Sequence, residues 1–391
     1  MQKVEKINFP YQLSLNAGGM PTSERMVIFF GTDFYNLPID SNRENYIIAT
    51  NKMLSYIRKH FSGFRLIYQA HPNEKDELGH LDLSGFTIGE KKVAEVLLYD
   101  NAARIEYVFS TCSWANGSAY AMGINSAVFL DLLKGCISDE SILAYHSYFE
   151  GLPEEFFITS FDQEPPRQRH DNSLREKDGF EKIKGAIGDS KKIWVLATDP
   201  ALALRGAIIC KELKETSPET KTGLLLISGR RWENVKEGRK LFDVFDEVVE
   251  MSHKKVWYSM RLPRIWNAIK VSFKMRKLPI KEGDTVISFS NLLFEENCIL
   301  SYFKRIKKIL MIESRWYFFV YEEQYRQLDP NAFNTFWGIR FFNFVLEPLL
   351  GLHRTIFKEF RDGKVINIFR YRKPLQETYD QTFVLMPDKI K

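Results

Sequence analysis

Two short stretches of the chain combine residues that could bind and transfer a phosphate-bearing group. The first follows the hydrophobic run 66–70 and reads His71-Pro72-Asn73-Glu74. A histidine at a strand end can bond a phosphate oxygen and stabilise the charge that develops on a departing nucleotide. Pro72 fixes the turn that aims the imidazole. We therefore interpret His71 as a candidate catalytic and nucleotide-binding residue, with Pro72 beside it in the nucleotide site.

The second stretch follows the next hydrophobic strand and reads Phe109-Ser110-Thr111-Cys112-Ser113-Trp114-Ala115-Asn116-Gly117. Hydroxyls and free backbone N–H groups at the start of a helix through 115–122 would hold phosphate or ribose oxygens, helped by the helix dipole. We predict that Ser110, Thr111 and Ser113 bind the nucleotide. The alternative for Ser113 is capping of that helix. Open parallel sheets bind ligands where strands end, so both stretches describe one pocket.

The region 24–135 resembles the donor-binding domain of bacterial CMP-sugar-dependent GT-B glycosyltransferases. This group comprises sialyltransferases and polysialyltransferases, with the related capsule-synthesis and Kdo transferases. The resemblance is carried by the strand 26–31, a loop with Asp33 and Asp40, His71-Pro72, Ala94-Glu95 on a helix, and Ser113 placed before Gly123. In that family a His-Pro motif and a Ser-Ser/Thr motif bind the CMP moiety. The resemblance therefore implies a CMP-sugar donor at His71 and the serines.

The same resemblance implies a fold of two Rossmann-like domains facing a cleft, the GT-B arrangement. In the sialyltransferases the donor domain follows the acceptor domain, whereas here it comes first. The two halves are thus expected in swapped order, as in a circular permutation, which is tolerated when chain termini lie close together.

Two carboxylates are candidates for the group that acts on the acceptor. In the family, a strand of the acceptor domain ends in an acidic pair followed by glycine, and one acid removes a proton from the acceptor hydroxyl. The matching segment 309–315 keeps one acid, Glu313. Asp199 ends the strand 193–197 and is the second candidate. A solvated strand-end carboxylate is the alternative for Glu313, and a helix start at Asp199-Pro200 is the alternative for Asp199.

Arginines near the same strand ends are candidates for binding an acidic or phosphorylated acceptor. Arg230 and Arg231 follow the strand 223–228, and Arg315 follows Glu313. Guanidinium groups bind carboxylates and phosphates in bidentate fashion. A surface charge cluster is an equally good explanation of Arg230 and Arg231. Ser288, which ends another strand, is either a further cleft residue or a helix cap.

Alternation of strands and helices along the chain predicts an α/β protein with mostly parallel sheets. We expect an N-terminal extension over 1–23, a donor-binding Rossmann-like domain over 24–160, a linker over 161–190, and an acceptor-binding Rossmann-like domain with a C-terminal helical region over 191–391. The expected strands are 26–31, 65–69, 86–88, 105–109, 127–130, 193–197, 223–228, 248–251, 285–289, 309–312 and 365–371.

Composition places the chain among globular proteins of a reducing compartment. It has 391 residues, of which 45% are hydrophobic, and a formal net charge of +5. The four cysteines are scattered without metal-binding spacing, which favours neither a disulfide framework nor a zinc site. A secretion signal and a membrane span are not predicted. We therefore expect a cytoplasmic protein.

The segment 251–277 carries eight Lys and Arg and no Asp or Glu, with Trp257, Tyr258, Trp266 and Phe273 among the cations. Such a surface suits a lipid-linked or lipopolysaccharide acceptor, and peripheral contact with the inner face of the plasma membrane. Nucleic acid would also suit the charge, although no nucleic-acid module is recognisable. The plainest alternative is a solvated face backed by core aromatics.

The motifs that the sequence lacks narrow the chemistry. It has no Asp-x-Asp, no phosphate-binding Gly-x-x-x-x-Gly-Lys loop, no Gly-x-Gly-x-x-Gly and no His-Glu-x-x-His. We therefore expect no metal and no cofactor. The sequence predicts a glycosyltransferase that moves a sialic-acid-like or Kdo-like sugar from a CMP donor to a saccharide acceptor in bacterial surface polysaccharide or lipooligosaccharide synthesis. The alternatives are a CDP-alcohol-type phosphotransferase, which has similar motifs, and a non-catalytic nucleotide- or glycan-binding relative.

Overall fold

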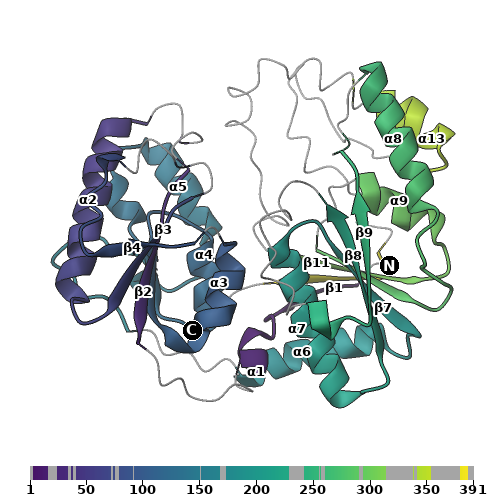
Figure 1. The fold of residues 1–391 in the computed structure, drawn as a ribbon, viewed down its shortest axis with the longest axis horizontal. Coiled ribbons are helices and arrows are strands. Elements are labelled where there is room, and N and C mark those ends of the chain that lie inside the picture. The colour runs from purple at the N-terminus through teal and green to yellow at the C-terminus, as the bar shows by residue number, and fades with distance from the viewer. Residues whose placement is uncertain are drawn as a thin grey trace. The chain divides into compact units, whose positions relative to one another are not determined.

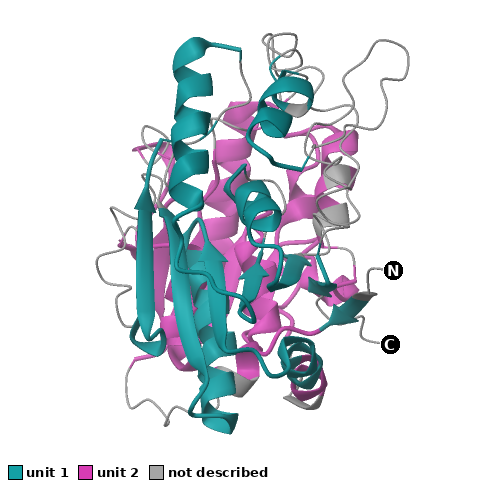
Figure 2. Ribbon diagram, turned by 90° about the vertical axis from the view of Figure 1, so that its right-hand side faces the viewer, with its two compact units in different colours: residues 1–7, 180–386 teal, residues 8–179, 387–391 magenta. Residues whose placement is uncertain are grey.

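A computed structural model of the chain divides it into two compact units, one formed by residues 8–179 and the other by residues 1–7 together with residues 180–386 (Figure 2). The described residues are 3–15, 24–33, 37, 41–71, 74, 79–90, 92–149, 151–167, 173–228, 242–254, 256, 260–289, 294–313, 338, 341–353 and 379–385.

The unit 8–179 contains a five-stranded sheet in the order β4-β3-β2-β5-β6, in which every neighbouring pair is parallel. The chain enters at the central strand, runs to one edge, and returns to fill the other side, which is the Rossmann strand order. Its strands are β2 (Met26–Phe30), β3 (Arg65–Gln69), β4 (Phe86–Ile88), β5 (Ile105–Ser110) and β6 (Ser126–Val128).

Helices cover both faces of this sheet, with α2 on one face and α3 and α4 on the other (Figure 1). Strands buried on both faces read as near-continuous apolar runs, as β2 and β5 do. The Asn42 side chain caps α2 by accepting a hydrogen bond from Asn45 N at 3.0 Å. The helices and short 3₁₀ turns are α2 (Arg43–His60), α3 (Ala94–Asn101), η3 (Ala102–Arg104), α4 (Ala115–Ala121), η4 (Leu130–Leu133), α5 (Asp139–Tyr148) and η5 (Glu154–Phe156).

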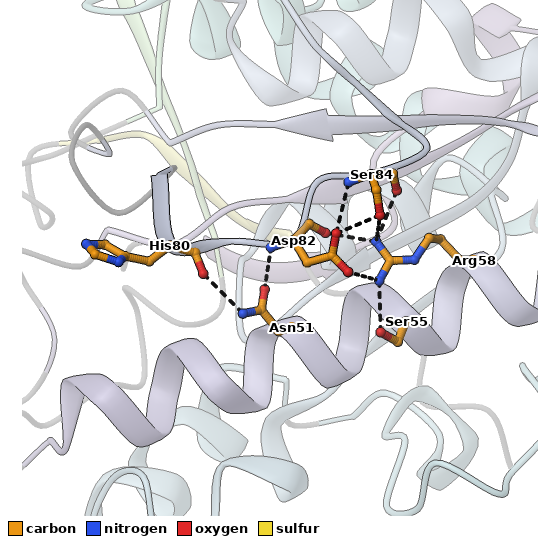
Figure 3. A network of polar contacts seen from close by, with 6 residues as sticks. All are labelled: Asn51, Ser55, Arg58, His80, Asp82 and Ser84. Atoms are coloured by element: carbon orange, nitrogen blue, oxygen red, sulfur yellow. Dashed lines mark hydrogen bonds and ion pairs between the residues drawn. The ribbon is translucent and has the colours of Figure 1, made fainter.

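A network of polar contacts fastens the segment 79–85, which leads into β4, to helix α2 (Figure 3). The Arg58 guanidinium donates to the Asp82 and Ser84 carbonyls at 2.8 and 3.0 Å and to Asp82 Oδ2 at 2.6 Å. Asn51 binds the same segment by donating to the His80 carbonyl at 3.1 Å and accepting from Asp82 N at 2.7 Å. Hydrogen bonds from Ser84 lower the pKa of Asp82, with Arg58 adding to the effect. The network anchors the chain that returns from the His71 turn.

The second unit contains a seven-stranded sheet in the order β1-β12-β11-β10-β7-β8-β9, again with every neighbouring pair parallel. The chain builds this sheet outward from β7 to β9 and then from β10 to β12 on the other side, so it too has a Rossmann-like order. Its strands are β1 (Lys3–Ile7), β7 (Lys192–Ala197), β8 (Lys221–Ser228), β9 (Glu247–Ser252), β10 (Thr285–Ser288), β11 (Lys307–Glu313) and β12 (Gln381–Leu385).

The remaining described helices are α1 (Tyr11–Leu15), α6 (Ser173–Ile187), α7 (Pro200–Thr216), α8 (Leu262–Met275), α9 (Phe294–Tyr302), the π-helical turn η7 (Phe342–Leu346) and α13 (Glu347–Leu349). None of the helices in the described part of the chain is long and apolar enough to cross a membrane. The prediction of an α/β protein with two Rossmann-like parallel sheets is confirmed.

The domain boundaries differ from the expected ones in three places. The expected N-terminal extension over 1–23 includes β1, which forms an edge strand beside β12. The expected linker 161–190 includes the helix α6, and the division between the units falls inside that helix, at residues 179–180. The last described element of the C-terminal region is the strand β12, which the sequence reading missed, while the expected strand 365–371 lies outside the described residues.

Candidate functional site

The candidate site lies at the carboxyl edge of the five-stranded sheet, around the neighbouring strands β2, β3 and β5. Phe30 pairs with Gln69 on one side and with Ser110 on the other, so the three strands end in register. The chain leaves β2 toward one edge of the sheet and β5 toward the other. The gap between them is therefore the topological switch point at which open α/β sheets bind ligands.

His71 lies just beyond β3, and its backbone is held by Glu74. The Glu74 carboxylate accepts a hydrogen bond from His71 N at 3.0 Å and another from the Tyr68 hydroxyl at 2.5 Å, while Glu74 N donates to the His71 carbonyl at 2.9 Å. Glu74 is buried, and burial raises the pKa of its carboxyl despite these two hydrogen bonds. Because the buried Glu74 carboxyl bonds both His71 N and the Tyr68 hydroxyl, it fixes the turn after β3. We therefore interpret Glu74 as a residue that positions His71. Pro72 lies outside the described residues.

The His71 imidazole is partly open to solvent, with 36% of its side chain exposed. Its Nδ1 lies 3.9 Å from Asp33 Oδ2, which belongs to the loop after β2. Burial lowers the pKa of His71, and the Asp33 carboxylate opposes the shift. At neutral pH the imidazole is therefore mostly uncharged, with one N–H to donate. The other loop aspartate of the resemblance, Asp40, lies outside the described residues.

A chain of hydroxyls ties the end of β2 to the end of β5. The Thr32 and Thr111 hydroxyl oxygens are 2.7 Å apart, and Thr32 is also 3.2 Å from the Tyr46 hydroxyl of α2. Tyr46 is fully buried, and burial raises its pKa well above its usual range, so it stays a neutral donor. Thr111 is almost completely buried too, whereas Thr32 is half-buried. Thr32, which the sequence reading did not single out, is thus the most exposed residue of these three hydroxyl-bearing residues.

The serines of the second stretch divide into a buried and a half-buried one. Ser110 is fully buried, and its Oγ accepts a hydrogen bond from Ser113 N at 2.8 Å, which shapes the turn after β5. Ser113 is half-buried, and its Oγ accepts from Ala115 N at 3.3 Å at the start of α4. Between them, burial raises the pKa of the Cys112 thiol to about 11, so no thiolate nucleophile is available. Ser113 is therefore the serine best placed to reach a ligand.

Together these residues make an edge that offers hydrogen-bond donors to an anion. His71, Thr32 and Ser113 supply one N–H and two hydroxyls after the three strand ends, and the Asp33 carboxylate lies beside His71. Such a set can bind phosphate oxygens and orient the histidine near a leaving group. The nucleophile and the base for a transfer reaction are not among them.

Of the two candidate bases and the three candidate acceptor-binding arginines in the second half of the chain, only Asp199 has a described side chain. It is the N-cap of α7, and its Oδ1 accepts a hydrogen bond from Leu202 N at 3.0 Å, with Pro200 as the first helical residue. Glu313 is the last residue of β11 and pairs in register with Leu385, and its side chain is not described. Arg230, Arg231 and Arg315 lie outside the described residues.

A buried polar cluster at the carboxyl ends of β9 and β10 was missed by the sequence reading. Ser288 Oγ donates to Glu296 Oε1 at 2.5 Å, and Glu295 Oε1 lies 3.3 Å from His253 Nε2. His253 Nδ1 is 3.1 Å from the Lys254 carbonyl, which can only accept, so Nδ1 is the donor of that hydrogen bond. The signal in the sequence was an acidic pair within the apolar run 292–300, since carboxylates are rarely buried without partners.

Comparison with known proteins gives only distant matches. No protein-family model and no curated protein matches the sequence. Among solved structures, a UDP-GlcNAc 2-epimerase from Neisseria meningitidis bound to UDP-GlcNAc is 12% identical, with 74% of this chain and 82% of that one covered and a TM-score of 0.19. A ketoreductase domain from the bacillaene assembly line is 10% identical, with coverages of 86% and 80% and a TM-score of 0.21.

The wall teichoic acid polymerase TagF, in a structure with CDPG, is 8% identical to this chain. The match covers 91% of this chain and 83% of that one, with a TM-score of 0.19. At such scores we draw nothing about function from any of the three.

Proposed function

We propose that this chain is a glycosyltransferase that moves an acidic sugar, sialic-acid-like or Kdo-like, from a CMP donor to a saccharide acceptor. In this scheme the unit 8–179 binds the donor nucleotide. The observation that carries the proposal is that Thr32, His71 and Ser113 follow β2, β3 and β5, the neighbouring strands that end at the switch point of a Rossmann-ordered sheet. The sequence resemblance over 24–135 supplies the choice of CMP as the nucleotide.

The proposed reaction breaks the bond between the anomeric carbon of the sugar and the CMP phosphate oxygen, and forms a bond from that carbon to an acceptor hydroxyl oxygen. The acceptor proton passes to a base, and CMP leaves with the bonding electron pair. Charge therefore develops on the phosphate, where an N–H from His71 and the hydroxyls of Thr32 and Ser113 stabilise it. In this scheme the imidazole takes up a proton when the nucleotide binds, so that Nδ1–H faces the Asp33 carboxylate and Nε2–H donates to the phosphate.

The first test is nucleotide binding measured by thermal stabilisation. A ligand at about a hundred times its dissociation constant adds roughly 2.7 kcal/mol to the free energy of unfolding, which is readily visible as a raised Tm. We expect CMP, and CDP more weakly or equally, to raise the Tm, while UDP and GDP do not. A response to UDP or GDP alone would contradict the choice of cytidine nucleotide.

The second arm is transfer activity of the variant His71→Ala, offered CMP-sugars and CDP-alcohols side by side. Loss of a group that stabilises developing charge typically costs about a hundred- to a thousandfold in rate. We expect that loss with CMP-sugars, an unchanged Tm, and a normal rate for the control His80→Ala, whose side chain is exposed on the same unit. Activity with CDP-alcohols alone would make the protein a phosphotransferase instead. Donor hydrolysis or transfer no faster than background would leave a binding protein.

The same assay separates the two carboxylates proposed as the base. Asparagine caps a helix about as well as aspartate, so Asp199→Asn keeps the start of α7 and removes only the basic carboxylate. We propose Glu313 as the base, because the Asp199 carboxylate is already engaged in capping. Glu313→Gln should therefore abolish transfer, and Asp199→Asn should leave it nearly intact. The opposite pattern would assign the base to Asp199.

A further inference from the structure

The helix α8 has apolar side chains on two opposite faces. One face, with Ala268, Val271 and Met275, is buried in the core of the unit 180–386. On the other face lie Leu262, Trp266 and Phe273, of which 80%, 58% and 54% are exposed. Their spacings of four and seven residues place them in one stripe along the helix. Large apolar residues gathered on one exposed helix face mark an interaction surface.

Cations surround this stripe. Eight Lys and Arg and no Asp or Glu occur between Met251 and Lys277. Lys270 Nζ lies 5.6 Å from the Trp266 ring centroid, and the Arg276 guanidinium carbon lies 5.3 Å from that of Phe273. Two of these positive charges therefore lie along the aromatic stripe itself. A partner for this face must be apolar and negatively charged at once.

The neighbouring segment η7–α13 extends the apolar surface. Phe342 and Leu346 share a core cluster with residues of α8, and the Arg276 guanidinium donates to the Leu350 carbonyl at 2.8 Å. The same segment leaves Phe344 and Leu349 exposed. Figure 1 shows α8 and α13 next to each other at one end of this unit. We call the exposed side chains of α8 and of 344–349 the aromatic-basic face.

We propose that the aromatic-basic face docks onto an anionic lipid bilayer, with Leu262, Trp266 and Phe273 inserted among the lipids and the cations at the headgroups. A helix with Trp, Phe and Leu on one face and Lys and Arg beside them lies in the plane of a membrane interface. Each Lys or Arg near an anionic surface adds to the binding. The proposal does not depend on which reaction the protein catalyses.

The charge of the aromatic-basic face favours a bilayer over two other partners, a second copy of the chain and nucleic acid. Pairing with a second copy through the same face would set the basic segment against itself, and like charges across an interface disfavour association. Nucleic acid would meet the cations but would gain little from an exposed Leu262. An anionic bilayer satisfies both the charge and the apolar side chains.

The test is co-flotation of the full chain with vesicles. One set of vesicles is phosphatidylcholine alone, and the other is phosphatidylcholine mixed with phosphatidylglycerol. We expect binding to the mixed vesicles only, weakened by salt because the cations contribute. The double variant Trp266→Glu, Phe273→Glu should bind at least about tenfold more weakly, since two large side chains are no longer buried in lipid. A variant with Lys270→Glu and Lys274→Glu should bind more weakly too and lose part of the salt dependence.

The matched control is Leu143→Glu, which changes an exposed leucine of α5 in the other unit and should bind vesicles like the wild type. All the changed positions of α8 are exposed, so circular dichroism and Tm should show unaltered folding. No binding to mixed vesicles, equal binding to both vesicle types, or undiminished binding of the double glutamate variant would overturn the proposal. So would a dimer in sedimentation that the double variant abolishes, or an oligonucleotide complex that the wild type prefers to vesicles.

Discussion

At the scale of single residues, the side chains around His71 differ in burial and hydrogen bonding in a way that their order in the chain does not show. Position after a strand was enough to predict that His71 would lie at the carboxyl edge of a sheet. Ser110, Thr111 and Ser113 look alike in the sequence, but the hydroxyls of Ser110 and Thr111 form hydrogen bonds within the protein. The three residues differ in how deeply they are buried. Their burial depends on the register of β5 with β2 and on the packing of α2, and a local sequence motif specifies neither. Their roles toward a nucleotide remain predictions.

The lowered pKa of His71 predicts that nucleotide binding takes up a proton. The free imidazole is mostly neutral at pH 7, and a phosphate beside it would favour the charged form. Protonation therefore rises on binding, and affinity for CMP should fall as pH rises above neutrality, by up to about tenfold per pH unit where the free site is neutral and the bound site charged. Calorimetry of CMP binding between about pH 6.5 and 8.5, above the second phosphate pKa of about 6, measures this in buffers of different ionisation heat.

His71→Gln should bind CMP without proton uptake and without that pH dependence, while His80→Gln should behave as the wild type. Without nucleotide, the pH dependence of folding stability has the opposite sign to that of CMP affinity. The folded state disfavours imidazolium, so the stability contributed by His71 is lost as pH falls below about 6.5 toward its lower folded-state pKa. Proton uptake that persists in His71→Gln would place the titrating group elsewhere.

At the scale of elements, the central strands were predicted nearly to the residue because parallel strands buried on both faces are uninterrupted apolar runs. The edge strand β1 was missed because Lys3, Glu5 and Lys6 break its apolar pattern, and an edge strand needs no second apolar face. The helix α8 was not predicted either, although its apolar residues recur with helical periodicity. The basic charge of the segment 251–277 was interpreted instead as a surface without an assigned element.

The end of β2 lies so close to the side chains of Glu74 and Tyr68 that a Cβ at position 31 would displace them. A Cβ there would lie 2.2 Å from Glu74 Oε2 and 2.7 Å from the Tyr68 hydroxyl. Gly31→Ala should therefore displace Glu74 and release the His71 backbone, at a cost of about 1 to 3 kcal/mol in stability. The control Gly63→Ala, where a Cβ has nothing within 4 Å, should be nearly neutral. Chemical denaturation measures the loss of stability, and the rise in Tm with CMP measures nucleotide binding. An unaltered rise in Tm with CMP in Gly31→Ala would mean that Glu74 does not position the nucleotide site.

At the scale of the whole molecule, the sequence predicted two Rossmann-like sheets but not how the chain is shared between them. The polar stretch 161–190 looked like a linker because its composition is charged, yet it contains α6, whose amphipathic pattern packs Phe180, Ile183 and Ile187 inward. The first strand belongs with residues 180–386 rather than with the sheet that follows it. Pairing of strands far apart in the chain leaves no local trace.

This division predicts which unit suffers when the first strand is damaged. Ile7 is a buried residue of β1, and Ile7→Ala should cost about 2 to 5 kcal/mol. We expect hydrogen exchange to lose protection in β11 and β12 while α2 and β5 keep theirs. Lys6→Ala, which removes an exposed side chain of the same strand, is the control and should change little. Loss of protection in β2 and β5 instead would mean that β1 supports the other sheet.

The pairing of Lys3–Ile7 with Gln381–Leu385 also constrains the order in which the strands can pair during synthesis. At about 5 to 20 residues per second, the ribosome needs roughly twenty to seventy-five seconds to make the residues between these two strands. During that interval all five strands of the smaller sheet have emerged and can pair, whereas β1 waits with its backbone groups unmatched. Its lysines and glutamate then act as gatekeepers against strand addition by other chains. Among the described strands, the earliest in the sequence is thus among the last to be placed.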